Sequence, residues 1–231
     1  MRAFLLIAAI FTAAAQAAIV NVQRVSVSNC VTGTANTITS TGANHLLVVT
    51  WSGNLQGTVT SITGGGTWLQ VSTAYALDSV SEGATDIWYV KSSTSGATSF
   101  TVNYATSASA GCQFWEFSGT DLGSVDQVNH LNSQGSTTSP SGPAVTTGTS
   151  GEIIITALAT GGSVSALAGG FTLRLTDVIG SGHGDDLTTT SGTFTPAWTT
   201  SAGTWAASAA SFKPAAAATA GTRFPLFGVG P

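Results

Sequence analysis

The residues best able to do chemistry in this chain are its few carboxylates, and Glu116 is the first candidate. It lies between Trp115 and Phe117 in an apolar segment, a setting that suits a catalytic acid. Glycosidases use two carboxylates, one as acid and one as nucleophile or base. The acids available as a partner are Asp86, Asp121, Asp126 and Glu152. None has the spacing that would place two acids on one face of a strand, so we expect Glu116 to bind backbone donors at the Ser118-Gly119 turn.

The acids Asp185 and Asp186 are the best candidates for a metal site. Carboxylates beside a loop such as Gly182-His183-Gly184 can bind calcium. Asp86 precedes a strand at the corresponding place in the first half of the chain, so we expect a turn or cap role for these acids and no metal. The three histidines, His45, His130 and His183, lie far apart in the sequence and do not have the spacing of zinc ligands. We expect no cofactor, and no Gly-x-Ser-x-Gly motif supports a serine hydrolase.

Tryptophan offers a different chemistry, because exposed aromatic rings with polar groups nearby can bind glycans. Trp51, Trp68 and Trp198 lie near expected strand ends or turns, where they would be presented at the surface. The tryptophans that fall in core-like strands are Trp88, Trp115 and Trp205. A place in the core is the alternative for the first three as well, since large aromatic side chains supply much of the buried area of a sandwich.

The two cysteines, Cys30 and Cys112, predict a disulfide if the chain is secreted. Closing a loop of about 80 residues adds roughly 4 kcal/mol to stability in the chain-entropy model. The alternative is a pair of buried free thiols, because Cys112 lies inside an apolar strand.

The segments that must position these residues have the pattern of strands. Phe100, Val102 and Tyr104 alternate with polar residues, which places one face inward. The segments 46–49, 87–90 and 112–117 are apolar on both faces, as in central strands. Clusters rich in Gly, Ser and Asp, such as 64–66 and 181–186, predict turns between strands. No window from 18 to 212 has convincing helical periodicity, so we expect an all-β chain.

The N-terminus has the pattern of a secretory signal peptide. Arg2 precedes a short apolar run, and Ala15-Gln16-Ala17 supplies a small-x-small cleavage site. A membrane anchor is the alternative, but the run is shorter than the ~20 residues that span a bilayer. We therefore divide the chain into a signal peptide at 1–17, a β-sandwich domain at 18–214, and an Ala-rich linker with a short apolar tail at 215–231. The tail is expected to be a frayed terminus, or a peptide that docks on a neighbouring subunit.

Charged residues make up 7% of the chain, against about 25% in typical globular proteins. Six Lys and Arg residues, scattered along the chain, cannot form the basic surface that nucleic acid requires. A hydroxyl-rich surface of low charge suits a protein that packs beside copies of itself or meets neutral glycans. We expect no nucleic-acid partner, and no transmembrane segment in the mature chain.

A weak internal repeat indicates two similar halves. His45–Val49 corresponds to Glu152–Thr156, and the Gly64–Leu69 segment corresponds to Gly169–Leu173. The first half closes on a strand that ends at Phe117, and the second on one that ends at Phe212. Two similar halves of four or five strands each predict a single antiparallel β-sandwich of jelly-roll type.

The order of several short motifs resembles a family of uncharacterised extracellular β-sandwich modules found in bacterial surface proteins and phage structural proteins. The motifs are Asn44–Val49, Glu116–Gly119, Gly170–Arg174, and Trp205–Ala207 with Phe212–Pro214. The resemblance covers residues 20–214. This chain departs from the family pattern at the 64–68 turn and in having Cys30 and Cys112. The resemblance implies fold and location, and it brings no catalytic residues.

These features predict a secreted, non-enzymatic structural or adhesive module at the cell surface, with a capacity for self-assembly. Its partners would be copies of itself, surface glycans, or envelope or virion components. A lectin-like domain that uses Trp51, Trp68 or Trp198 is the alternative from a different class. A glycan-cleaving enzyme built around Glu116 is the third hypothesis.

Overall fold

The computed structural model describes residues 16–106, 109–123 and 125–216, and the regular structure in this part of the chain is entirely β-strand. The strands of the first half are β1 (Val20–Val27), β2 (Ala35–Thr37), β3 (Leu46–Gly53), β4 (Thr58–Thr63), β5 (Leu69–Gln70), β6 (Ala76–Asp78), β7 (Gly83–Val90), β8 (Ser99–Ala105) and β9 (Ala110–Ser118). The strands of the second half are β10 (Gln127–Thr137), β11 (Val145–Thr147), β12 (Ile153–Thr160), β13 (Val164–Ala168), β14 (Thr172–Thr176), β15 (Gly182–Leu187), β16 (Gly192–Phe194), β17 (Ala197–Thr200) and β18 (Gly203–Phe212). Among the described residues no helix could cross a membrane.

Each half of the chain forms one large sheet, and the strand order of the two large sheets is the same. The first-half sheet runs β1-β9-β3-β7-β5, with β6 also paired to β7, and the second-half sheet runs β10-β18-β12-β15-β14. A smaller layer accompanies each sheet: β2-β8-β4 in the first half, and the pairs β11-β16 and β13-β17 in the second. Neighbouring strands are antiparallel. The predicted all-β antiparallel sandwich with two similar halves is confirmed.

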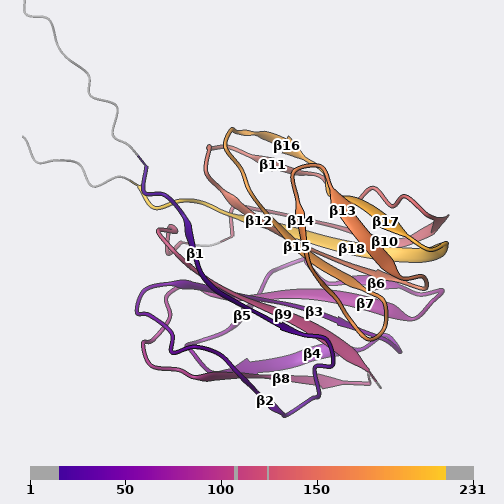
Figure 1. The fold of residues 1–231 in the computed structure, drawn as a ribbon, viewed down its shortest axis with the longest axis horizontal. Coiled ribbons are helices and arrows are strands. Elements are labelled where there is room, and N and C mark those ends of the chain that lie inside the picture. Colours follow the sequence, from indigo (N-terminus) through magenta and orange to yellow (C-terminus); the bar gives the residue numbers. More distant parts are fainter. Residues whose placement is uncertain (1–15, 107–108, 124, 217–231) are drawn as a thin grey trace, which may run out of the picture.

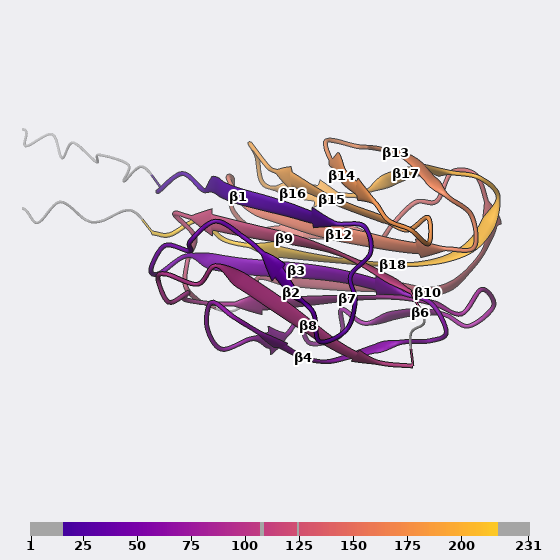
Figure 2. The ribbon, with the colours of Figure 1, turned by 60° about the horizontal axis from the view of Figure 1, so that its bottom comes forward.

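The two halves are stacked, and each sheet contains strands of one half only. Figures 1 and 2 show the β2-β8-β4 layer, the first-half sheet, the second-half sheet and the outer pairs in succession. The large sheets therefore face each other in the middle of the molecule and are covered on both sides. This stacking explains why β3 and β12 are buried along their whole length and read as apolar runs on both faces.

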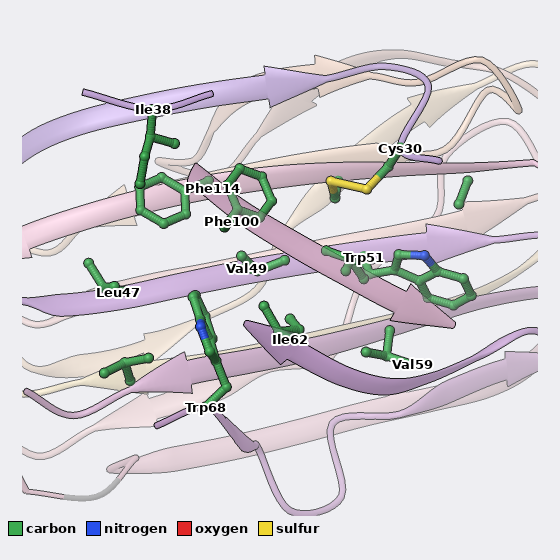
Figure 3. Packing of buried hydrophobic residues seen from close by; sticks show 14 of the residues in the cluster. Cys30, Ile38, Leu47, Val49, Trp51, Val59, Ile62, Trp68, Phe100 and Phe114 are labelled. Atoms are coloured by element: carbon green, nitrogen blue, oxygen red, sulfur yellow. A yellow bond between two sulfur atoms is a disulfide. The ribbon is translucent and has the colours of Figure 1, made fainter. Parts of the chain in front are cut away.

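The core of the first half lies between its large sheet and the β2-β8-β4 layer. The rings of Phe100 and Phe114 stack with centroids 5.1 Å apart, and Trp51 lies 5.4 Å from Tyr104. Figure 3 shows the disulfide of Cys30 within this core. It joins Cys30 to Cys112, with the Cα atoms 5.7 Å apart, and ties the loop after β1 to a central strand. The predicted disulfide is confirmed.

The interface between the two large sheets is apolar at one end and polar at the other. At the apolar end, Val48 and Phe117 of the first half belong to one cluster with Ile155 and Phe212 of the second. The residues at the polar end are Thr50, Ser52, Thr85, His183 and Ser208, all buried. The halves are thus joined by hydrophobic burial at one end and by hydrogen bonds at the other.

The Gly-rich turn before β5 is confirmed, and its counterpart occurs before β14. Gly64 has φ +95°, and a Cβ atom there would meet the carbonyl oxygen of Ser99. Gly169 and Gly170 have φ +79° and +94° in the second half. Positive φ is available to glycine without steric cost, so both turns depend on this residue type.

The turn predicted at 181–186 is wrong, because Gly182–Leu187 form strand β15. A Cβ at Gly182 would meet Trp198, and one at Gly184 would meet Leu167. The glycines therefore allow the outer layer to pack closely on this strand and do not make a turn.

Two predictions fall largely outside the described residues. The signal peptide expected at 1–17 lies there up to residue 15, and the tail expected at 215–231 lies there from residue 217. At the border of the described part, Ala17 donates a backbone hydrogen bond to Ala215 at 3.3 Å, and Ala215 donates to Gly119 at 2.8 Å.

Candidate functional site

Glu116 lies on β9 with its carboxylate buried beneath the segment between β2 and β3. Its Oε1 atom accepts from the Gly42 amide at 2.8 Å and lies 2.6 Å from Nδ1 of His45. The Oε2 atom accepts from Nε2 of Gln23 at 2.5 Å. Glu116 therefore serves a backbone donor at a turn, as expected, but the donor belongs to Gly42 and not to the Ser118-Gly119 turn.

The acids considered as partners of Glu116 have partners of their own. Glu152 accepts from the Thr149 amide and hydroxyl and from Ser211. Asp126 pairs with Lys213, and this hydrogen bond is the main reason why the pKa of Lys213 is raised. Glu152 and Asp121 add smaller charge effects on Lys213. Three of the four acids thus gather near Lys213.

Asp86, the fourth acid, is buried in β7. It accepts from Nε2 of Gln70 at 2.8 Å, from Nε1 of Trp88 at 2.7 Å and from the Ile87 amide at 2.9 Å. Desolvation outweighs these three donors and raises the pKa of Asp86 to about 6. Its partners are the Gln70 and Trp88 side chains and the Ile87 amide, all within its own sheet, so the turn or cap role predicted for Asp86 is wrong.

The prediction that Trp51, Trp68 and Trp198 form an exposed aromatic platform is wrong. Trp51 is fully buried, Trp68 is 8% exposed and Trp198 is 2% exposed. Trp68 also donates its Nε1 hydrogen to the carbonyl of Gly64 at 2.7 Å, beneath the Gly-rich turn. The small residues around these tryptophans allow close packing of the layers, and they do not mark exposed strand ends.

A buried polar cluster that sequence reasoning missed joins the two halves. Nδ1 of His183 lies 2.7 Å from Oγ1 of Thr50, and Nε2 lies 3.1 Å from Oγ of Ser52. Ser52 donates to Asp177, whose other oxygen accepts from the amides of Ile179 and Ser181 at 3.0 Å each. The cluster contains a hydroxyl, an imidazole and a carboxylate in contact, but the side chains of His183 and Asp177 have no exposed surface. These hydrogen bonds join β3 of the first half to β15 of the second and so stabilise the contact between the two large sheets.

A cavity lies between the edge strands of the two large sheets, and we call it the β1/β14 cavity. It has a volume of about 290 Å³. Its polar lining consists of Asn21, Arg24, Thr172, Arg174, Asp185 and Asp186. The rest of the lining is Ile19, Phe117, Ile153, Gly170 and Leu187.

Asp185 is the centre of the charged groups in the β1/β14 cavity. Arg174 donates to it from Nη2 at 2.6 Å and from Nε at 2.9 and 3.0 Å. Trp115 donates from Nε1 at 2.6 Å, and Nη1 of Arg24 lies 3.6 Å away. These hydrogen bonds hold the guanidinium group of Arg174 in place, whereas Arg24 is attracted only across 3.6 Å. Asp185 is a mid-strand ion-pair partner, so the predicted turn or cap role is wrong for it as well.

Asp186 has a different environment. Its carboxylate accepts none of the side-chain hydrogen bonds found among the described residues. Partial burial, and then the neighbouring charge of Asp185, raise its pKa above the ordinary value. The β1/β14 cavity therefore presents one acceptor group that the protein leaves without a donor.

A second cavity lies beside β5 in the first half, and we call it the β5 cavity. It is also about 290 Å³, and its lining residues are Gly66, Thr67, Leu69, Val90, Lys91, Ser92 and Thr94. The strand registers relate positions of the two halves. Leu69 pairs with Tyr89 as Thr172 pairs with Asp185, and Leu47 pairs with Val90 as Ile154 pairs with Asp186. The second half thus has acids at the positions of Tyr89 and Val90.

No group of three or more His, Cys, Asp or Glu residues in the described part of the chain could hold a metal ion. The all-β fold and the cavity lined by arginine and aspartate define a disulfide-containing β-sandwich protein with an ion-paired cavity at a sheet edge. Comparison of the chain with protein-family models, with curated proteins and with solved structures gave no match. The resemblance to extracellular sandwich modules therefore stays a prediction.

Proposed function

We propose that this protein is a secreted, non-enzymatic structural or adhesive module that acts at a cell surface or in a surface assembly. The observation that carries the proposal is that Glu116, Asp177 and His183 have no exposed side-chain surface. A group that reacts with a substrate must meet it. These side chains instead hydrogen-bond across strands and across the two halves, where they hold the fold together.

The extracellular location is supported by the signal-peptide pattern and by the disulfide. Structural disulfides form and persist in oxidising compartments and are rare in the cytosol. The β-sandwich, with a disulfide inside its first half, is a stable scaffold of the kind that an exposed protein needs.

Self-association is supported by strand β1. It is an outer strand of the first-half sheet, and Val20 and Val22 on it are exposed. The outer edge of this eight-residue strand is a template for pairing with another chain, and a second copy of this protein is the occupant we propose.

The alternatives are weaker. The three tryptophans of the lectin-like hypothesis are buried in the core, so carbohydrate binding would have to use another surface. The enzyme hypothesis depends on Glu116, which no cavity described above contains. An E116Q variant that abolished cleavage of a polysaccharide by the protein would restore it.

The test begins with expression of the full 231-residue sequence in a bacterial host. We expect the product outside the cytoplasm, with a mature start at Ala18 by mass spectrometry and no thiol that reacts before reduction. Unprocessed cytoplasmic protein with two free thiols would overturn the extracellular proposal.

Assembly is tested by light scattering and electron microscopy of the concentrated protein, beside the V20K/V22K variant. We expect oligomers that this variant weakens, and V80K, at an exposed site outside the strands, serves as the control. A protein that stays monomeric and does not bind isolated cell envelopes would contradict the structural and adhesive role.

A further inference from the structure

We infer that the β1/β14 cavity is a binding site for a neutral, hydroxyl-rich ligand, a saccharide ring or short oligosaccharide. This inference rests on the proposed adhesive function and names the class of ligand that would be bound. It uses none of the buried tryptophans.

The first argument is that the equivalent edge of the same fold has apolar residues at the positions that correspond to Arg24 and Asp185. The strand registers place Arg24 opposite Trp115 and Val128 opposite Ala210, at equivalent positions of the two edge strands β1 and β10. Tyr89 is the equivalent of Asp185. Val128 and Tyr89 pack in one apolar cluster. The same fold thus closes one edge with apolar contacts, while the other edge carries ions around a cavity.

The edge beside β10 is also closed by hydrogen bonds. Asn132 accepts from the Leu77 amide at 2.9 Å, and Ser133 accepts from the Ser79 amide at 3.0 Å. On the opposite edge, Arg24 and Arg174 remain 34% and 28% exposed. The cavity is therefore open to a ligand at the edge where the charged groups lie.

The second argument is the balance of charge. Two guanidinium groups and two carboxylates line the cavity, so their formal charges cancel. An anionic ligand would meet Asp186, and a cationic ligand would meet Arg24 and Arg174. A neutral ligand avoids both repulsions.

The third argument is the supply of hydrogen-bonding groups. Asp186 is an acceptor without a donor, whereas Arg24 is a donor held only at 3.6 Å by Asp185. A hydroxyl group can donate and accept at once, so adjacent hydroxyls can satisfy both residues. The aliphatic side chains of Ile19, Ile153 and Leu187 provide surface for the C–H groups of a sugar ring. A volume of about 290 Å³ is at the lower end of the range for small-ligand pockets.

The experiment is a glycan array probed with the purified protein, which presents neutral, sialylated and sulfated oligosaccharides. Titration calorimetry then gives affinities for the best neutral sugar. The variants are R24V and D186V, which introduce the residues of the equivalent positions Val128 and Val90. K91A, in the β5 cavity, is the matched control.

We expect binding to a subset of neutral glycans, weakened at least tenfold by R24V and by D186V and unchanged by K91A. Thermal unfolding of each variant identifies any that fails to fold. Asp186 has no partner to lose, so D186V keeps the test decisive if R24V does not fold.

A flat array, binding to charged glycans only, or neutral-glycan binding that both variants retain would overturn the inference. A flat array from a protein that still assembles or binds envelopes would leave the proposed function standing. If secretion and assembly fail but neutral-glycan binding persists, the proposed function is contradicted and the glycan-binding site is supported.

Discussion

The carboxylate of Glu116 and the imidazole of His45 lie 2.6 Å apart at the end of the first-half core. In the second half, the equivalent positions are occupied by Ser211 and Glu152, whose side-chain oxygens lie 2.9 Å apart. The registers support this equivalence, because Leu46 pairs with Phe117 as Ile153 pairs with Phe212. Both halves thus close their core with a hydrogen-bonded pair, but the acid stands on opposite strands.

Because the acid is on β9 in the first half and before β12 in the second, we expect different effects on stability when Glu116 or Glu152 is replaced by glutamine. In E116Q, the new amide would face the Nε2 donor of Gln23, which cannot reverse its role because it also donates to the Thr39 carbonyl. In E152Q, the amide can donate to the Ser211 hydroxyl, which can accept. We expect E116Q to lower the free energy of unfolding by about 1–3 kcal/mol and E152Q by less than about 1 kcal/mol. Urea unfolding of both variants measures this, and equal losses would contradict the assignment.

The hydrogen bond between Thr50 and His183 predicts a coupling between the two halves. H183I introduces the residue of the equivalent position Ile87 and leaves the buried Thr50 hydroxyl without a partner, at a cost of roughly 1–3 kcal/mol. T50V/H183I removes both hydrogen-bonding groups and should recover much of this loss, because an apolar pair leaves no unsatisfied group. A double-mutant cycle by chemical unfolding measures the coupling. A double variant less stable than H183I would argue against it.

Asp86 predicts a specific pH dependence of stability. Its pKa is about 6 in the folded protein, against an ordinary value of 3.8, so the folded state binds the proton more tightly than the unfolded state does. Its contribution is therefore fully present below about pH 4 and is lost as the pH rises through 6. The loss amounts to about 3 kcal/mol at 1.36 kcal/mol per pKa unit.

The measurement is urea unfolding of the wild-type protein and D86N from pH 4 to pH 8. We expect the wild type to lose stability relative to D86N across this range, whatever the absolute stability of the variant. Parallel curves for the two proteins would show that Asp86 does not titrate as its burial implies.

The disulfide predicts a large effect of reduction. It closes a loop between residues 82 positions apart, which corresponds to about 4 kcal/mol in the chain-entropy model. We expect C30A/C112A and the reduced wild type to lose similar amounts of stability, and the unreduced protein to have no reactive thiol. A double variant as stable as the oxidised protein would show that the link contributes nothing to the unfolding equilibrium.

Much of the fold could be predicted from local patterns. Leu46–Val49 is apolar on both faces because β3 lies between two layers, and Phe100, Val102 and Tyr104 alternate because β8 is covered on one face. Strand β10 was not predicted from the sequence. Its polar sequence and irregular pairing with β18 belong to a half-exposed edge strand, which needs few apolar residues.

The candidate sites depended on contacts that no local pattern contains. The tryptophans near Gly and Ser residues were expected at the surface, but Gly182 is small so that Trp198 can pack on it. The acids of β15 were expected in a turn, but Asp185 binds Arg174 on β14 and lies near Arg24 on β1.

The sequence by itself determined the strand content, the twofold repetition and the pairing of its only two cysteines, because each depends on residue type, spacing or count. Tertiary structure decided which polar residues meet. Thr50 and His183 are 133 positions apart and touch only because the two large sheets stack face to face. The equivalent edges of that stack are an apolar contact at Tyr89 and an ionic cavity at Asp185. Tyr89 meets Phe212 of the other half, whereas Asp185 meets Trp115 of the other half and Arg174 of its own.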